Sequence, residues 1–118
     1  MTPEELKTRT KSLALRVIRL ARTLPRDPAG RTVADQIVRS ATSVGANYRA
    51  ACRAQSRATF SAKLAIAEEE ADETLYWLEI LSESGLVKPE RLTELLKETR
   101  EIVAIITASR RTASTRSR

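Results

Sequence analysis

Apolar residues repeat at intervals of three and four along almost the whole chain, which is the spacing of one face of an α-helix. Short segments that contain proline or glycine divide this repeat into four stretches. The pattern therefore predicts four helices, over residues 3–24, 28–54, 57–84 and 89–108. Residues 109–118 carry no apolar repeat, and we expect them to form a basic disordered tail.

The residues at the ends of these stretches support the division. Thr-Pro at 2–3 and Asp-Pro at 27–28 each place an N-capping side chain before a proline that suits the first helical position. Gly85 fits the left-handed residue that ends a helix. Gly45 lies inside the second stretch, where glycine costs about 1 kcal/mol relative to alanine. We therefore expect another helix to pass close to Gly45.

Helices of this length joined by short loops pack antiparallel to their neighbours in sequence. The predicted fold is all-α, an up-down-up-down antiparallel four-helix bundle formed by residues 1–108. The chain of 118 residues has one Trp, one Phe and two Tyr, so its core must be mainly aliphatic. Its apolar runs fall short of the roughly 20 residues that a membrane span needs, so we expect no membrane contact.

The second and third stretches each carry a second face that is apolar or made of small residues. Two interpretations fit it: a wide core with scattered surface apolar residues, or a subunit interface. We favour the interface because Trp77 is large and tryptophan often anchors interfaces. The predicted interface residues are Arg39, Ser43, Ala50, Ile66, Glu70, Glu73, Trp77 and Ile80.

Charge is unevenly distributed along a chain whose net charge is +6. Residues 1–57 contain twelve Lys and Arg against four Asp and Glu, and residues 58–108 contain five against eleven. Such a basic region suits nucleic acid, because a guanidinium donates two parallel hydrogen bonds to phosphate. The alternative is that these cations keep the surface soluble or pair with the acidic half. The candidate nucleic-acid-binding residues are Arg16, Arg19, Arg22, Arg26, Arg49, Arg53, Arg110 and Arg111.

Five of the six residues from 68 to 73 are carboxylates, which raises the question of a metal site. Metal sites in helical bundles use acids that converge on the axis, typically with histidine, and this chain has no histidine. At 100° per residue the five acids surround their helix instead of sharing one side. We therefore predict that they balance charge and that the protein has no metal or other cofactor. The sequence leaves open whether they pair within a subunit or with Arg39 or Arg49 of another.

Nothing in the sequence assembles a catalytic group. Cys52 and the serine and threonine hydroxyls have no histidine base, and there is no glycine-rich phosphate loop. The helical pattern places Cys52 beside the core, where it acts as a small hydrophobe. A single cysteine suits a reducing compartment, so we expect a cytoplasmic protein. We predict a protein that is not an enzyme, the alternative being an enzyme that works at a subunit interface.

The segment from 36 to 81 reads QIVRSATSVGANYRAACRAQSRATFSAKLAIAEEEADETLYWLEIL. In its spacing, and at positions such as Gln36, Arg39, Asn47, Phe60 and Glu73, it resembles the bacterial four-helix-bundle family called S23 ribosomal or 23S rRNA intervening-sequence proteins. The resemblance implies a bundle that assembles as a ring, with a homopentamer expected. A similar bundle serves as a nucleic-acid-binding accessory protein to the reverse transcriptases of diversity-generating retroelements.

Two functions follow as predictions. The first is an oligomeric bundle that binds RNA or DNA backbone through its arginine-rich surface. The second is a structural scaffold, or an adaptor for a protein partner, that binds no nucleic acid.

Overall fold

The computed structural model describes residues 1–116, and residues 117–118 lie outside the described part. Four long helices and one short 3-10 helix make up this part, which contains no strand. In chain order they are α1 (Pro3–Ala21), α2 (Pro28–Cys52), α3 (Arg57–Glu83), η1 (Pro89–Arg91) and α4 (Thr93–Arg116). The all-α prediction and the four helices are confirmed.

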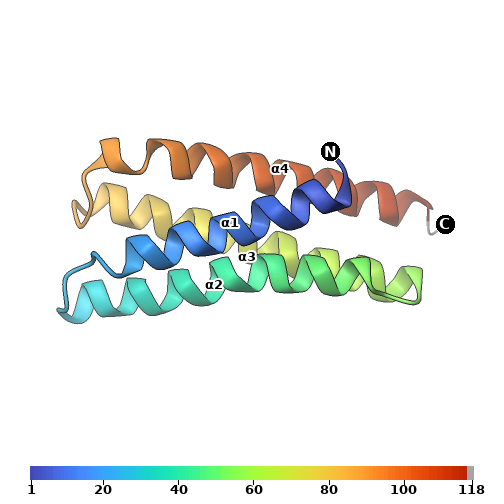
Figure 1. The fold of residues 1–118 in the computed structure, drawn as a ribbon, viewed down its shortest axis with the longest axis horizontal. Coiled ribbons are helices and arrows are strands. Elements are labelled where there is room, and N and C mark those ends of the chain that lie inside the picture. The colour runs from blue at the N-terminus through green and yellow to red at the C-terminus, as the bar shows by residue number, and fades with distance from the viewer. Residues whose placement is uncertain (117–118) are drawn as a thin grey trace.

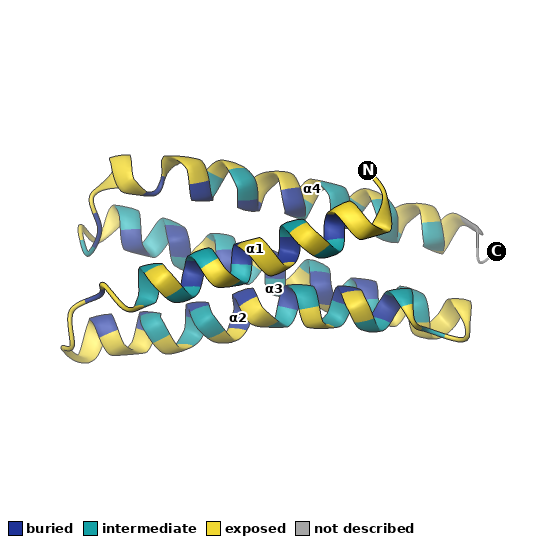
Figure 2. Ribbon diagram, viewed as in Figure 1, coloured by how far each residue is buried: buried dark blue, intermediate teal, exposed yellow. Residues whose placement is uncertain are grey.

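The long helices lie lengthwise and side by side, with their connections at the two ends of the bundle (Figure 1). The bundle measures 48 × 22 × 22 Å. Helix α2 packs against both α1 and α3, and α4 packs against both α3 and α1, so the four helices enclose one core. Figure 2 shows buried positions recurring along each helix between exposed ones.

Local side chains define where the helices begin and end. Thr2, Asp27 and Ser56 each accept a hydrogen bond from the backbone N–H three residues later, which confirms the N-caps predicted at Thr2 and Asp27. Glu5 accepts a bond from the N–H of Thr2 in return, which completes a capping box. Gly85 adopts a φ of 79°, as predicted for the residue that follows α3.

Two glycines mark places where backbones come close. A Cβ added at Gly45 would lie 3.2 Å from Oγ1 of Thr10, so the predicted close approach is confirmed as the packing of α1 on α2. A Cβ added at Gly30 would overlap the carbonyl oxygen of Pro25 in the preceding connection. The first contact needs a shift of only a few tenths of an ångström, whereas the second is a direct overlap with backbone.

Each long helix also contributes one buried hydroxyl to the largely aliphatic core: Thr10, Ser40, Thr74 and Thr99. The hydroxyl of Thr74 lies 3.0 Å from that of Ser40, which links α3 to α2 inside the core. The hydroxyls of Thr10, Ser40 and Thr99 each donate to a backbone carbonyl three or four residues earlier in their own helices, and the single proton of the Thr74 hydroxyl lies within reach of both Ser40 and the carbonyl of Glu70. Every buried polar side-chain atom in the described residues therefore has a hydrogen-bond partner, as burial requires.

The end of the chain differs from the expected disordered tail. Helix α4 continues through residues 109–116 instead of ending near 108. Nε of Arg110 donates to Glu68 on α3 at 2.7 Å, and the side chain of Ala113 packs partly buried against the core. These contacts with the rest of the bundle hold a segment whose own sequence has no apolar repeat. Ser117 and Arg118, the last two residues of the predicted tail, lie outside the described residues.

The difference between the two glycine sites predicts opposite tolerances to alanine. Gly30→Ala should lower the free energy of unfolding by more than about 1 kcal/mol, because its Cβ meets backbone. Gly45→Ala is the matched control and should be nearly neutral, because the gain of about 1 kcal/mol in helix propensity offsets mild crowding of Thr10. Urea unfolding followed by circular dichroism measures both. Equal decreases in the free energy of unfolding of the two variants would contradict the view that only Gly30 lies against backbone that an added Cβ would overlap.

Candidate nucleic-acid interface

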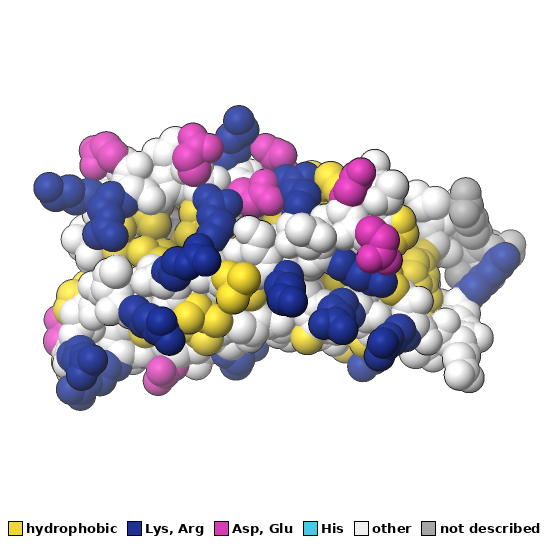
Figure 3. Space-filling view, viewed as in Figure 1, with side chains coloured by type: hydrophobic (Ala, Val, Ile, Leu, Met, Phe, Trp, Pro, Cys, Tyr) yellow, Lys and Arg dark blue, Asp and Glu magenta, His cyan; other side chains and the backbone are white. Residues whose placement is uncertain are grey.

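Seven cations on α1, in the connection after it and at the end of α2 form a surface that we call the basic face. In Figure 3 Lys and Arg side chains spread over α1 and α2, while most of the acids in view lie over α4. All seven side chains are exposed except that of Arg16, which is half-buried. The members of the basic face are Lys11, Arg16, Arg19, Arg22, Arg26, Arg49 and Arg53.

Two shallow grooves run along α1 and bring these cations together. One groove of about 330 Å³ lies between α1 and α2, and its lining includes Lys7, Lys11, Arg49 and Arg53. Glu4 also lines it, but this carboxylate is engaged by Lys7 at 3.0 Å. The other groove, of about 290 Å³, is lined from α1 by residues that include Arg16 and Arg19. From η1 and α4 its lining includes Arg91 and the carboxylate Glu94. The fold therefore gathers cations that are separated in sequence.

The arginines of the basic face form no salt bridge with a described residue, although the charge of Arg16 contributes, after the hydrogen bonds from Arg9, to lowering the pKa of Glu98. No acid in residues 1–116 forms an ion pair with any of its six arginines, whereas three other arginines, Arg9, Arg39 and Arg110, each contact at least one carboxylate. The interpretation that arginines pair with the acidic half therefore holds for these three arginines. Arg110 was a predicted nucleic-acid-binding residue, but the structure engages it with Glu68. Arg111 is exposed on α4.

Arg9 connects α1 to α4, a role that the sequence analysis did not find. Its Nε donates to Glu98 at 2.9 Å, and its Nη2 donates to Glu98 and to Glu101, the latter at 3.0 Å. The hydrogen bonds from Arg9 hold the pKa of Glu98 below its usual range and raise the pKa of Arg9. This clip fixes α1 against α4, while Lys11 and Arg19 of α1 remain exposed. Arg9 and Glu98 are 89 residues apart, so no local pattern reveals the pair.

Helices α2 and α3 share a second surface, which we call the α2–α3 face. Nη1 of Arg39 lies 2.9 Å from Oε2 of Glu70, and Nη2 of Arg39 contacts Glu73. The indole N–H of Trp77 donates to Glu73 at 3.0 Å. The pKa of Glu73 is lowered first by the Trp77 hydrogen bond and then by Arg39. Four predicted interface residues therefore contact one another within one chain. Of the acids, Glu70 and Glu73 pair with Arg39 inside the same subunit.

The rest of the α2–α3 face presents apolar and small side chains. Ile66 is 37% exposed, and Ser43, Ala50, Trp77 and Ile80 are half-buried. Tyr76 is 52% exposed and meets Trp77 edge to face, with ring centroids 5.0 Å apart. Tyr76 was not among the predicted interface residues, although its position beside Trp77 in the sequence could have indicated it. Apolar surface of this kind is typical of a protein contact.

The acidic run of α3 is mostly paired. Glu68 bonds Arg110, and Glu70 and Glu73 bond Arg39, so three of its five carboxylates have an arginine partner. Glu69 and Asp72 are exposed. Within residues 1–116, no group of three or more Cys, Asp or Glu side chains is arranged to hold a metal ion. The pairing supports the charge-balancing interpretation of the run.

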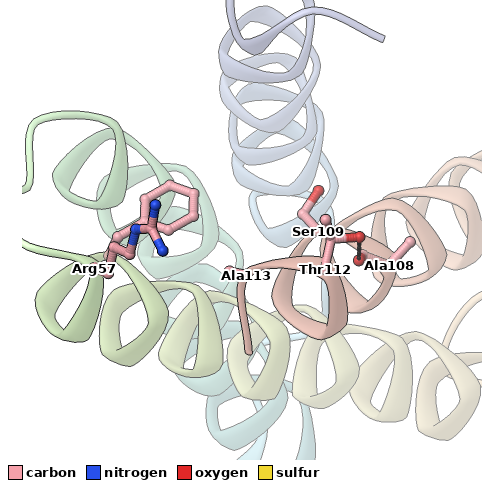
Figure 4. A pocket seen from close by; sticks show the side chains of 6 residues that line it. Arg57, Ala108, Ser109, Thr112 and Ala113 are labelled. Carbon is pink, nitrogen blue, oxygen red and sulfur yellow. Dashed lines mark hydrogen bonds between the residues drawn. The ribbon is translucent and has the colours of Figure 1, made fainter. Parts of the chain in front are cut away.

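A further hollow lies between the start of α3 and the end of α4. It encloses about 490 Å³ and is lined by Arg57, Phe60, Ala108, Ser109, Thr112 and Ala113. In Figure 4 Arg57 lies on the α3 side and Ser109 and Thr112 on the α4 side. This lining brings together no nucleophile with a base. Cys52 is half-buried beside Tyr48, whose pKa is raised by burial and then by a hydrogen bond with Cys52.

None of the helices in the described part of the chain is long and apolar enough to cross a membrane.

Comparisons with known proteins agree with the resemblance seen in the sequence. Residues 4–108 match the family described as 23S rRNA-intervening sequence protein. The fold is similar to the crystal structure of a protein with unknown function from the S23 ribosomal protein family of Bacteroides thetaiotaomicron VPI-5482, with a TM-score of 0.86. The two sequences are 35% identical over 94% of this chain and 99% of the other. A search of curated proteins gives no match.

The Arg39–Glu73–Trp77 network predicts a pH-dependent contribution to stability. Because the folded state lowers the pKa of Glu73, its carboxylate stabilises the fold above the unfolded pKa, near 4.5, and this contribution is lost as the pH falls through the folded pKa. Glu73→Gln should therefore lower the free energy of unfolding at neutral pH by up to about 1 kcal/mol, the range of partly exposed ion pairs. The difference from the unsubstituted protein should shrink as the pH falls below that range.

Urea titrations over the acidic range, followed by the fluorescence of Trp77, measure this difference. Glu69→Gln is the matched control, because it removes a carboxylate from an exposed position of the same helix that lacks an ion pair with any described residue. If the decrease in the free energy of unfolding caused by Glu73→Gln stays constant with pH, the charge of Glu73 contributes nothing to stability.

Proposed function

The chain belongs to the 23S rRNA-intervening sequence protein family, and we propose that it acts by binding RNA or DNA backbone through the basic face. In this proposal it is not an enzyme, and it works in the cytoplasm as an oligomer of antiparallel four-helix bundles. The observation that carries the proposal is the set of six arginines on the basic face that form no salt bridge with any described residue.

A polyanion is the ligand class that suits this arrangement. The cations lie in more than one groove along α1 instead of converging on one point, so a single small anion would engage few of them. The bundle is 48 Å long, which allows several successive phosphates to be contacted at once. Arginine also suits phosphate because its planar fork donates two parallel hydrogen bonds.

Self-association through the α2–α3 face is the second part of the proposal. Its exposed apolar side chains, Tyr76 and Ile66 among them, support a contact with another copy. We propose that copies form a ring, with five subunits as the expected number. A ring repeats the basic face around its axis, so that weak phosphate contacts from several subunits combine into one multivalent site.

Binding should depend steeply on salt, because each neutralised phosphate releases counterions. Six contacts to a duplex predict that log affinity falls with log salt at a slope of about −5 per subunit engaged. Arg49→Gln combined with Arg53→Gln should lower affinity and flatten this slope. The matched control is Lys88→Gln combined with Arg100→Gln, an equal loss of two charges at exposed positions outside the basic face. Filter binding with RNA and DNA over a range of salt measures all three proteins.

An absence of RNA and DNA binding tighter than about 10 μM at low salt, where non-specific binding normally reaches roughly 10⁻⁴–10⁻⁶ M, would refute the proposal. The scaffold or adaptor function would then be favoured.

The α2–α3 face gives a separate prediction about assembly. Trp77→Ala removes the largest side chain of the face, and Ala50→Glu places a charge on it. Both variants should dissociate the oligomer and retain most of their helicity. Light scattering reports mass and circular dichroism reports helicity. Ala50→Glu keeps the test valid if Trp77→Ala also weakens the subunit through the lost Glu73 hydrogen bond. An unsubstituted protein that is monomeric at micromolar concentration would end this part of the proposal.

A further inference from the structure

We propose that the basic face binds double-stranded nucleic acid in preference to single strands, through phosphates and without stacking on bases. This inference rests on the proposed function and names the ligand class of the same surface. The basic face carries several cations that form no salt bridge with a described residue, and it carries no aromatic side chain. The preference for a duplex follows from these two features together.

All four aromatic residues of the chain are placed elsewhere. Tyr48 is buried in the core at 6% exposure. Phe60 lines the hollow between α3 and α4. Tyr76 and Trp77 pack against each other on α3, and the N–H of Trp77 is already bonded to Glu73. No ring is therefore available to a base that lies over α1 or the grooves beside it.

Single-strand-binding surfaces combine cations with aromatic rings on which successive bases stack. A surface with cations alone recognises charge density, which is higher in a duplex because both strands contribute phosphates. Helix α1, which carries three of the seven cations, is held in place by its cap at Thr2 and by the clip to α4 through Arg9. Cations that project from a fixed helix suit the fixed phosphate rows of a duplex, whereas a flexible strand must lose conformational entropy to match them.

The far side of the molecule also disfavours a single strand. The outer surface of α3 exposes Glu69, Asp72 and Glu83, whose charges repel phosphate. A flexible strand that follows the basic face cannot continue around the bundle to gain further contacts. A rigid duplex makes its contacts on one side only, so it loses nothing from this acidic surface.

The size of the preference follows from counterion release. The slope of log affinity against log salt is about −0.9 per contact for a duplex and −0.7 for a single strand. For six contacts, the ratio of duplex affinity to single-strand affinity therefore rises by about 1.2 decades for each tenfold reduction in salt. Contacts that are otherwise equal at about 1 M salt therefore give a duplex preference of roughly tenfold at about 0.1 M.

The experiment compares duplex DNA, duplex RNA and unstructured single strands of each, all of equal length. A length of about 20 base pairs, at about 3.4 Å per pair, exceeds the 48 Å bundle. Fluorescence anisotropy at several salt concentrations gives affinities and slopes for the whole protein. We expect each duplex to bind roughly tenfold tighter than its single strands at about 0.1 M salt, with the steeper slope.

A second arm supplies the aromatic side chain that the basic face lacks. Leu15 is 46% exposed on α1, one turn after Lys11 and one turn before Arg19. Leu15→Trp should raise single-strand affinity about fivefold or more by stacking and leave duplex affinity nearly unchanged. Leu15→Ala is the matched control and should change neither.

The outcomes separate the inference from the proposed function. Single strands that bind as tightly as duplexes, both weakened by the Arg49→Gln Arg53→Gln pair, overturn the duplex preference and leave the nucleic-acid function standing. An absence of all binding overturns both. Leu15→Trp without effect on single strands overturns the argument that a missing aromatic side chain sets the preference.

Discussion

Three arginines determine how charge is distributed over this bundle. Arg9, Arg39 and Arg110 each contact carboxylates on a helix far away in sequence, which joins α1 to α4, α2 to α3 and α4 to α3. Partly exposed pairs of this kind contribute only about 0–1 kcal/mol each, so the aliphatic core carries most of the stability. Their larger consequence is that they neutralise many of the acids of α3 and α4. The six arginines of the basic face form no salt bridge with a described carboxylate, so their positive charge stays at the surface.

Packing inside the bundle positions that charge. Gly45 allows α1 to lie close against α2, with Thr10 at the contact, and Arg9 holds α1 to α4 from the other side. The Thr74–Ser40 hydrogen bond fixes α3 against α2 within the core. A buried hydroxyl pair is satisfied in few alignments, because a shift of one turn would leave both partners without their bond. The groove lined by Lys7, Lys11, Arg49 and Arg53 is therefore a product of core packing as well as of surface composition.

The sequence predicted the helices well because their signals are local. Apolar spacing, the caps at Thr2 and Asp27 and the stop at Gly85 act within a few residues of where they occur. The extension of α4 was missed because its support is tertiary: Arg110 meets a carboxylate 42 residues earlier in the chain. The same limit affected the candidate site, since counting arginines identified the basic region but could not show that Arg110 is engaged and Arg49 is not. Arg9, the clip of α1, carried no local signal at all.

Helix α2 takes part in both proposed surfaces, which constrains how they work together. Arg39 points to α3 and joins the network of Glu70 and Glu73, while Arg49 and Arg53 line the groove with α1. If copies associate through the α2–α3 face, α1 lies outside that contact and its cations stay accessible. Assembly then changes the number of phosphate contacts available to one polyanion without changing the chemistry of any single contact. In the proposed function, where single phosphate contacts are weak and read no bases, this multiplication would supply the affinity that one subunit lacks.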